Sequence, residues 1–517
     1  MWCCHVDGIV KLKIFEGYVM RKIIEEQMKL GEVDIRKIAF DPRSRDEIPQ
    51  LLRGLQHLYC IPSLRQAVFN LLETYLKKTG NGRPGMDLWK ILVLGVVRLN
   101  CNWNYDRLKE MADHHSKIRE MLGHVPWIDR TDYPMQTLKD NVRLLTPELL
   151  DDINDIAVKA GQNLVKKNAG KLQGKCDSFV GETNVHYPTD INLLYDAVRK
   201  SVELTVRLCD ESGIPGWRQS VFLLDKLRRQ LHFCEKLKHS TAKNLEKQKL
   251  KTHEIKAAHS EYLEQSEMLI DKVTVSTGHA LKSGDATTAG QVVVIDRFAA
   301  DARHQIDLVT RRVLKGETIP HEDKFFSIFE KHTEWICKGK AGTPQELGLR
   351  VGLIVDQYGF ILSHLVMEKI GDIESAKTLL AAAKKRFPDL YSCSFDQGYW
   401  SPENVAELQK IVQVPAMMKR GRLSQADRER QESEEFQQAR QKHSAVESAI
   451  NALENHGLDR CPDRGINGFK RYVALAVTAR NIQKLGAEIQ KKERKKLERS
   501  KKIKEGLKRK EQMAEAA

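Results

Sequence analysis

Residues 390–403 constrain this 517-residue chain most, because an apolar run ends there in a carboxylate and a sharp turn. Residues 390–395 have the aliphatic and aromatic composition of a buried strand, which delivers Asp396. Gly398 allows the backbone to turn, and residues 401–403 supply the hydroxyl cap, proline and acid typical of a helix start. An acid between a strand and a helix is held in place and faces open space. A metal-dependent enzyme needs acids in such positions, and other carboxylates of the chain would have to lie beside Asp396 to complete a metal site.

The pattern on both sides of this segment predicts a mixed α/β domain. A short β-branched and aromatic stretch precedes a charged helical region, and several strands and helices follow that region. The predicted strands are 176–187 (a strand or hairpin), 334–340, 347–356, 360–367, 390–396 and 412–418, and the predicted helices after the charged region are 373–387 and 403–411. This order favours a mixed sheet with helices on its faces.

The two ends of the chain have a different character. Residues 1 to about 170 show helical periodicity, and the helices predicted at 88–98 and 104–113 are compatible with a helix-turn-helix, although helix pairs of this kind are common. Residues 491–510 contain twelve Lys or Arg and three Glu. They form either a disordered tail or a basic helix, and either would bind a phosphate backbone without sequence preference.

Composition narrows the class of protein. The formal net charge of +15 favours a polyanionic partner, nucleic acid first, over a merely solvated basic surface. The ten cysteines include no Cys-x-x-Cys pair, which disfavours zinc ribbons and thioredoxin-type chemistry and fits a reducing compartment. The chain shows neither a signal-peptide pattern nor an apolar run long enough to span a bilayer. We therefore expect a soluble, cytoplasmic protein without membrane contact.

Three acids occupy positions that the local pattern fixes. Asp177 lies on the first predicted strand, Asp396 ends a later one, and Glu447 lies near the apolar stripe of a predicted helix. Three convergent carboxylates fit Mg²⁺, and a pair of such ions activates water or a 3′-hydroxyl and stabilises the leaving oxygen at a phosphodiester. Asp356 is a rival, but its Asp-Gln-Tyr-Gly setting is typical of a hairpin turn, and we interpret it as structural.

Basic and aromatic residues near these acids are candidates for DNA contacts. Arg440 and His443 precede Glu447 by seven and four residues, which predicts one common helix face, where they would bind phosphate or form surface ion pairs. Trp400 would stack on an unpaired base or, as the favoured alternative, pack at the sheet edge. Lys338, Lys340, Lys470 and Arg471 complete this set.

Taken in order, several segments resemble the DDE transposases of bacterial insertion sequences, more narrowly the group labelled ISNCY, which is related to proteins with a ribonuclease-H-like core. The segments that carry the resemblance are 82–123, 177–194, 334–348, 394–404, 445–458 and 468–472. Related members often have Tyr, Arg and Lys around the final Glu, where this chain has Arg440, His443 and Glu454.

The resemblance implies a ribonuclease-H-like mixed sheet flanked by helices and interrupted by a long helical insertion. The implied domains are a helical DNA-binding domain at 1–170, the first part of the catalytic core at 171–189, the insertion at 190–325, the remaining core at 326–485 and a basic helical tail at 486–517. Asp177, Asp396 and Glu447 would be the catalytic metal ligands.

The activity implied is that of a transposase. It would bind the terminal repeats of its own element, hydrolyse phosphodiester bonds at the ends and join the 3′-hydroxyl to target DNA. Mg²⁺ is the expected cofactor, and Mn²⁺ can substitute. The expected partner is double-stranded DNA, bound by a homodimer or higher oligomer in the cytoplasm, at the nucleoid. Two alternatives remain open: a metal-dependent DNA nuclease with the same core, and a catalytically inactive DNA-binding relic.

Overall fold

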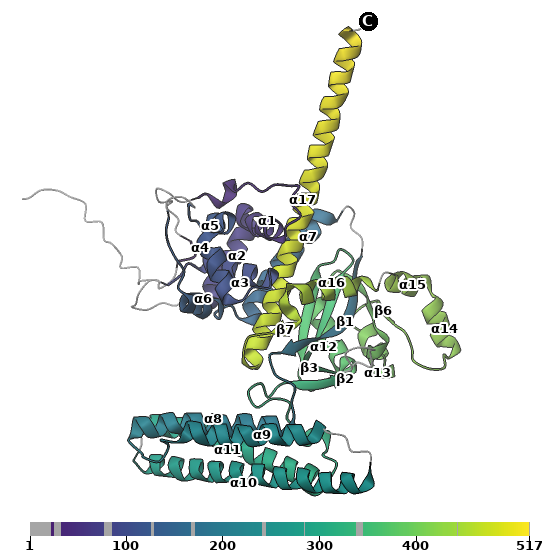
Figure 1. Cartoon of the computed structure of the whole chain (residues 1–517). Helices are drawn as coiled ribbons and strands as arrows, with labels where there is room; N and C mark the ends of the chain where they lie inside the picture. Colours follow the sequence, from purple (N-terminus) through teal and green to yellow (C-terminus); the bar gives the residue numbers. More distant parts are fainter. Residues whose placement is uncertain are drawn as a thin grey trace, which may run out of the picture. The chain divides into compact units, whose positions relative to one another are not determined.

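The computed structural model describes residues 22–24, 33–76, 85–125, 129–166, 171–239, 244–283, 285–337, 345–441 and 443–515 (Figure 1). The chain forms two compact units. The first comprises the residues up to Glu182, then Leu349–Asp463 and Asn467 onward; the second comprises Thr183–Gly348 with Arg464–Ile466. Each unit is described separately below.

The N-terminal part of the first unit is helical, as the periodicity predicts. Its elements are η1 (Ile35–Lys37), α1 (Glu47–Cys60), α2 (Pro62–Leu76), α3 (Leu88–Asn100), α4 (Tyr105–His114), α5 (Ser116–Met121), α6 (Met135–Val142) and α7 (Pro147–Val165). Side chains of Asp46, Asn104 and Thr146 accept hydrogen bonds at the starts of α1, α4 and α7. All residues of α3 except Lys90 are buried, so this helix forms the centre of the helical part.

A mixed sheet forms the rest of the first unit and extends into the second through β2 and the start of β3. Its strands are β1 (Leu172–Thr183), β2 (Glu334–Cys337), β3 (Gln345–Asp356), β4 (Ile361–Met367), β5 (Leu390–Phe395), β6 (Val414–Met417) and β7 (Arg460–Cys461). Along the sheet the order is β2-β3-β1-β5-β6, with β4 paired to β3 and β7 to β1. β1, β5 and β6 run parallel to one another, whereas β3 is antiparallel to both β2 and β4.

Helices follow the strands in the order that the sequence predicts. They are α12 (Asp372–Arg386), η4 (Gln397–Tyr399), α13 (Pro402–Gln409), α14 (Gln425–Glu432), α15 (Glu434–Arg440), α16 (Ala445–Leu453), η5 (Glu454–Leu458) and α17 (Gly465–Glu515). α12 packs on β4 and β5, and α13 and α15 pack on β6. The mixed α/β prediction is therefore confirmed.

The longest helix, α17, joins the helical part to the sheet. Its inner half contributes buried residues such as Phe469, Val473 and Leu485, and its outer half extends away from the rest of the unit (Figure 1). The basic segment 491–510 is thus a helix rather than a disordered tail, and the predicted boundary at 485/486 falls inside α17.

α1 and α17 cross with their backbones in contact. A Cβ atom added to Gly486 would lie 1.8 Å from the Gln50 carbonyl oxygen, and one added to Gly54 would lie 2.0 Å from the Ile482 oxygen. Only glycine fits at both positions, because the opposing atoms belong to backbone that the two helices hold rigid.

The second unit is a bundle of four helices followed by short elements. The helices are α8 (Asp190–Ser212), α9 (Ser220–His239), α10 (Leu245–Ser283) and α11 (Ala286–Val309), and they are followed by η2 (Thr310–Leu314) and η3 (His321–Asp323). They lie side by side around a core that includes Leu194, Tyr262 and Val273 (Figure 1). The Tyr262 hydroxyl donates to the Ile191 carbonyl at 2.9 Å, which ties α10 to α8.

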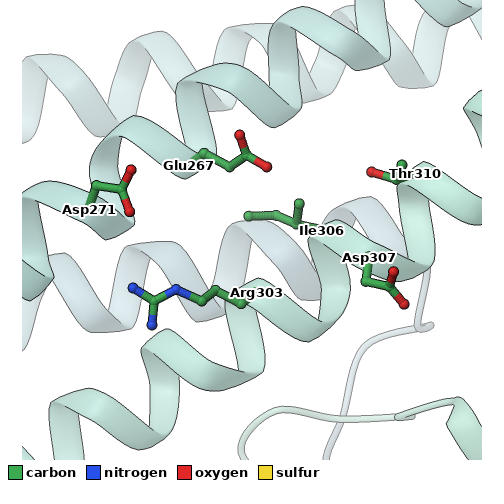
Figure 2. A pocket seen from close by; sticks show the side chains of 6 residues that line it. All are labelled: Glu267, Asp271, Arg303, Ile306, Asp307 and Thr310. Atoms are coloured by element: carbon green, nitrogen blue, oxygen red, sulfur yellow. The ribbon is translucent and has the colours of Figure 1, made fainter.

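A pocket opens between α10 and α11 of this bundle. Glu267 and Asp271 line it from α10, and Arg303, Ile306, Asp307 and Thr310 line it from α11 and η2 (Figure 2). The Arg303 guanidinium donates to the Thr274 hydroxyl at 2.7 Å. None of the residues predicted to form the catalytic site lines this pocket.

None of the helices in the described part of the chain combines the length and apolarity that a bilayer crossing requires.

The α1–α17 crossing predicts opposite effects for the same substitution at two places on one helix. Gly486→Ala should destabilise the first unit by about 1–3 kcal/mol, because the methyl group must push the two backbones apart. Gly506→Ala should be neutral or stabilising, because no atom lies within 4 Å of the added Cβ and alanine favours helix. Thermal unfolding followed by circular dichroism would measure both. Equal melting temperatures for the two variants would contradict the crossing.

Candidate active site

Asp177 and Asp396 each lie one residue beyond a pair of matched positions on two neighbouring parallel strands. β1 and β5 are in register up to Cys176 and Phe395, so the two acids are the next residues on their chains. Adjacent strands lie about 4.8 Å apart, which brings these two positions together although 219 residues separate them in sequence (396 − 177). Asp177 is half-buried, and Asp396 is exposed beyond the end of β5.

The turn after Asp396 has the predicted form. Asp396 precedes η4, and the Ser401 hydroxyl accepts from the Asn404 amide at 3.0 Å at the start of α13, with Pro402 in the first turn. This strand, turn and helix hold the Asp396 backbone in place.

Glu447 lies in the first turn of α16, and its side chain is exposed. The prediction that it lies near the buried stripe is wrong. Val446, Ala449 and Ile450 are buried, but each residue turns the helix by about 100°, so Glu447 points away from the middle of this arc. The carboxylate therefore needs no buried partner, and its link to the site rests on its proximity to Asp177.

Four carboxylates share one electrostatic environment. Burial raises the pKa of Asp177 to about 6, and the charges of Asp396, Asp372 and Glu447 raise it in the same direction, against a hydrogen bond from the Ser178 amide. The charges of Asp396 and Glu447, two of the acids predicted from sequence, thus act on the third, Asp177. The structure adds a fourth acid, Asp372, which the sequence reasoning missed because an acid at a helix start is ordinary.

Asp372 is the first residue of α12 and is tied to β1. One of its oxygens accepts from the Ser178 hydroxyl at 2.7 Å. Its Oδ2 atom lies 3.6 Å from the point that a Cβ of Gly398 would occupy, and Oδ2 of Asp396 lies 3.8 Å from the same point. The absence of a side chain at Gly398 leaves this space between the two carboxylates open.

The donor set suits a hard divalent cation, because carboxylate oxygens are the ligands that Mg²⁺ and Mn²⁺ prefer and a cation would offset both the burial and the neighbouring charges that raise the Asp177 pKa. Within the ranges that the structure describes, however, no three His, Cys, Asp or Glu side chains are grouped closely enough to hold a metal ion. The acids influence one another electrostatically without forming such a group.

Asp356 lies apart from this cluster, in the β3–β4 turn. Its carboxylate accepts from the backbone amides of Tyr358 and Phe360 at 2.8 and 2.9 Å and from the Gln162 side chain at 2.8 Å. Burial raises its pKa, and these hydrogen bonds oppose the rise. Two of these contacts close the turn and the third ties it to α7, as expected for a structural aspartate.

Arg440 and His443 contact the end of β5, although not from the predicted helix face. α15 ends at Arg440 and α16 begins at Ala445, so the three residues do not share one helix, and the prediction of a common face is wrong. The Arg440 guanidinium donates to the Phe395 carbonyl at 3.4 Å, and His443 Nδ1 is 2.8 Å from the Ser394 hydroxyl. Burial and Arg440 lower the pKa of His443, so the ring is neutral at pH 7.

The other predicted DNA contacts are placed outside the carboxylate cluster or beyond the described residues. Lys470 pairs with Glu368 at 2.5 Å, and Arg471 pairs at 2.8 Å with Asp463, which also binds Arg98. Trp400, two residues after Gly398, is partly buried with the Lys419 ammonium 5.9 Å from its ring centre. Lys338 and Lys340 lie outside the described residues.

Comparison with known families matches residues 409–486 to the model of a family described as a transposase DDE domain. The match begins at the end of α13 and ends at Gly486 on α17, so it includes Glu447, Arg440 and His443 but neither Asp177 nor Asp396. Comparisons with curated proteins and with solved structures returned no match. The matched segment, a small part of the chain, supports a DDE transposase.

Proposed function

We propose that this protein is a DDE transposase with a ribonuclease-H-like core, of the ISNCY-like group. The observation that carries the proposal is the placement of Asp177 and Asp396 one residue beyond paired positions on adjacent parallel strands, together with the family match over the segment that contains Glu447. The mixed sheet with Asp177 and Asp396 on adjacent parallel strands supports the same core.

In this proposal Asp177, Asp396 and Glu447 hold two divalent cations, Mg²⁺ in the cell. The cations, when bound, would activate water or a 3′-hydroxyl and stabilise the leaving oxygen at the phosphodiester. Asp177 loses its proton to take part, and the exposed Asp396 and Glu447 side chains turn toward it to complete the donor set. Neutral His443, held by Ser394, and the Arg440 cation face the DNA strand beside Asp396.

DNA binding, the domain roles and the cellular site belong to the same proposal. The N-terminal helices would read the terminal repeats, and residues 190–325 would be an insertion in the core. The basic half of α17 would contact the phosphate backbone in a sequence-independent way. The protein would act as a homodimer or higher oligomer on DNA, in the cytoplasm at the nucleoid.

Removing single carboxylates tests the site. Asp396→Asn and Glu447→Gln should each reduce cleavage of labelled element-end DNA with Mg²⁺ at least about a hundredfold, on the order of 3 kcal/mol in activation free energy, because each removes a charged metal ligand. Glu403→Gln is the matched control: this acid is exposed in the first turn of α13, close in sequence to Asp396. Unchanged cleavage in the Asp396 and Glu447 variants would place the active site elsewhere.

A second assay separates transposase from nuclease. End DNA with a free 3′-hydroxyl, incubated with the wild-type protein, Mg²⁺ and a supercoiled target plasmid, should give a covalent product in which the labelled strand is joined to the plasmid. Gel electrophoresis under denaturing conditions measures the joined product. Cleavage without joining would favour the nuclease, and binding without either reaction would favour the inactive relic.

The pKa of Asp177 predicts how cation binding depends on pH. A carboxylate with a pKa of about 6 is mostly ionised at pH 7 and mostly protonated at pH 5, so the affinity for Mn²⁺ should fall about tenfold between these values. Titration calorimetry of the whole protein with Mn²⁺ would measure the change. Asp177→Asn should bind Mn²⁺ weakly with little dependence on pH over this range. An affinity of the wild type that stays constant from pH 7 to pH 5 would remove Asp177 from the ligand set.

A further inference from the structure

The loop at residues 418–423, between β6 and α14, is the second feature at the carboxylate edge of the sheet. β6 is paired in parallel with β5, and Met417 is in register with Phe395. The loop therefore leaves β6 beside the point where Asp396 leaves β5. It contains three cations in four residues: Lys419, Arg420 and Arg422.

The backbone of this loop is fixed at several points. The Gln397 side chain donates to the Lys419 carbonyl at 3.5 Å, and the Lys419 ammonium pairs with Asp427 at 2.5 Å. Ser424 caps α14, and its hydroxyl donates to the same Asp427 carboxylate at 2.6 Å. Gly421 has φ +82°, a left-handed conformation that glycine adopts without strain, and it forms the turn between the two arginines.

Arg420 extends toward the candidate active site. Its Nη2 atom lies 3.9 Å from the point that a Cβ of Gly398 would occupy, the same point that is flanked by Oδ2 atoms of Asp372 and Asp396. The open space at Gly398 is therefore bordered by two carboxylates and one guanidinium.

Arg420 and Arg422 form no direct ion pair with an acid among the described residues. Both side chains are exposed, and neither lies within ion-pair distance of a carboxylate among the residues that the structure describes. Lys419, Lys470 and Arg471, in contrast, are each paired with an acid. An exposed guanidinium presents a fixed fork of donors that matches the oxygens of a phosphate.

We propose that the loop 418–423 is a phosphate-binding loop, in which Arg420 and Arg422 bind the DNA backbone next to the phosphodiester that lies at the carboxylates. This assignment rests on the proposed function and identifies residues that contact the DNA strand at the same site. Arg420 approaches the site and holds the strand beside Asp396, and Arg422 contacts the neighbouring phosphate. The contacts of Lys419 with Gln397 and Asp427 keep the backbone that carries both arginines in place before DNA arrives.

Binding to a 30-base-pair fluorescent duplex of mixed sequence, measured by anisotropy in EDTA over a range of salt concentrations, tests this assignment. Arg420→Ala and Arg422→Ala should each weaken binding about tenfold at 0.1 M salt and reduce the slope of log affinity against log salt by about 0.9, uniformly across duplex sequences. Lys385→Ala is the matched control, because this exposed lysine near the far end of α12 loses the same charge.

A wild-type affinity and salt slope in the Arg420→Ala, Arg422→Ala double variant would overturn the proposal. If Arg420 instead only balances the neighbouring acids, its loss would change the melting temperature and leave the salt slope unchanged, which also overturns it. Arg422→Ala keeps the test valid if Arg420→Ala does not fold. Asp396→Asn serves as the separate check on the proposed function: unchanged cleavage by that variant refutes the active site whatever the loop binds.

Discussion

The rest of the first unit depends on the buried side chain of Asn481, which joins α17, α7 and β4. Its amide donates to the Ile361 carbonyl at 2.8 Å and to the Asn154 side chain at 2.6 Å, and its oxygen accepts from the Ile361 amide at 3.0 Å. Both backbone groups of a strand residue are thus satisfied by a helix, where water cannot reach them. About one turn further along α17, Gly486 lies directly against the backbone of α1. A helix held at two such points fixes the helical part against the sheet, and the family match ends at the second of them, Gly486.

This frame explains how four like charges can lie together. Asp177 and Asp396 are held by the hydrogen bonds of β1 and β5, which adjust little to repulsion between side chains. Asp372 and Glu447 lie in the first turns of α12 and α16, where the helix dipole favours negative charge. Asp177 is half-buried, and its burial, together with the charges of the other three acids, raises its pKa. A bound cation would offset the repulsion among these four carboxylates. Without a cation, protonation of one of them reduces the repulsion.

The parts of the fold that sequence predicts well are those that short segments determine. The strand, turn and helix around Asp396 follow from the composition of about fourteen residues, and they are as predicted. The two errors concern a direction and a boundary: the Glu447 side chain points out of the buried arc of α16, and the chain leaves the helix after Arg440, so that Arg440 and Glu447 lie on different helices. Asp372 could not be found, because only the register of distant strands and the bond from Ser178 bring it to Asp177. A pattern local in sequence carries no information on such contacts.

The net charge of +15 predicts a polyanionic partner but not where it binds, because many of the cations are already paired. Arg98 and Arg471 both bind Asp463, and such pairs hold the fold together rather than attract DNA. Unpaired positive charge matters more, and it occurs at the loop 418–423 and on the outer half of α17. Among its described side chains, at residues 491–506, none is buried, and the helix there is supported by weak pairs such as Lys501 with Glu505 at 3.9 Å. Repulsion among its lysines opposes the helix, so a phosphate backbone that neutralises them would stabilise it. The outer half of α17 would therefore gain most stability from a bound polyanion, although it contributes least to the packing of the fold.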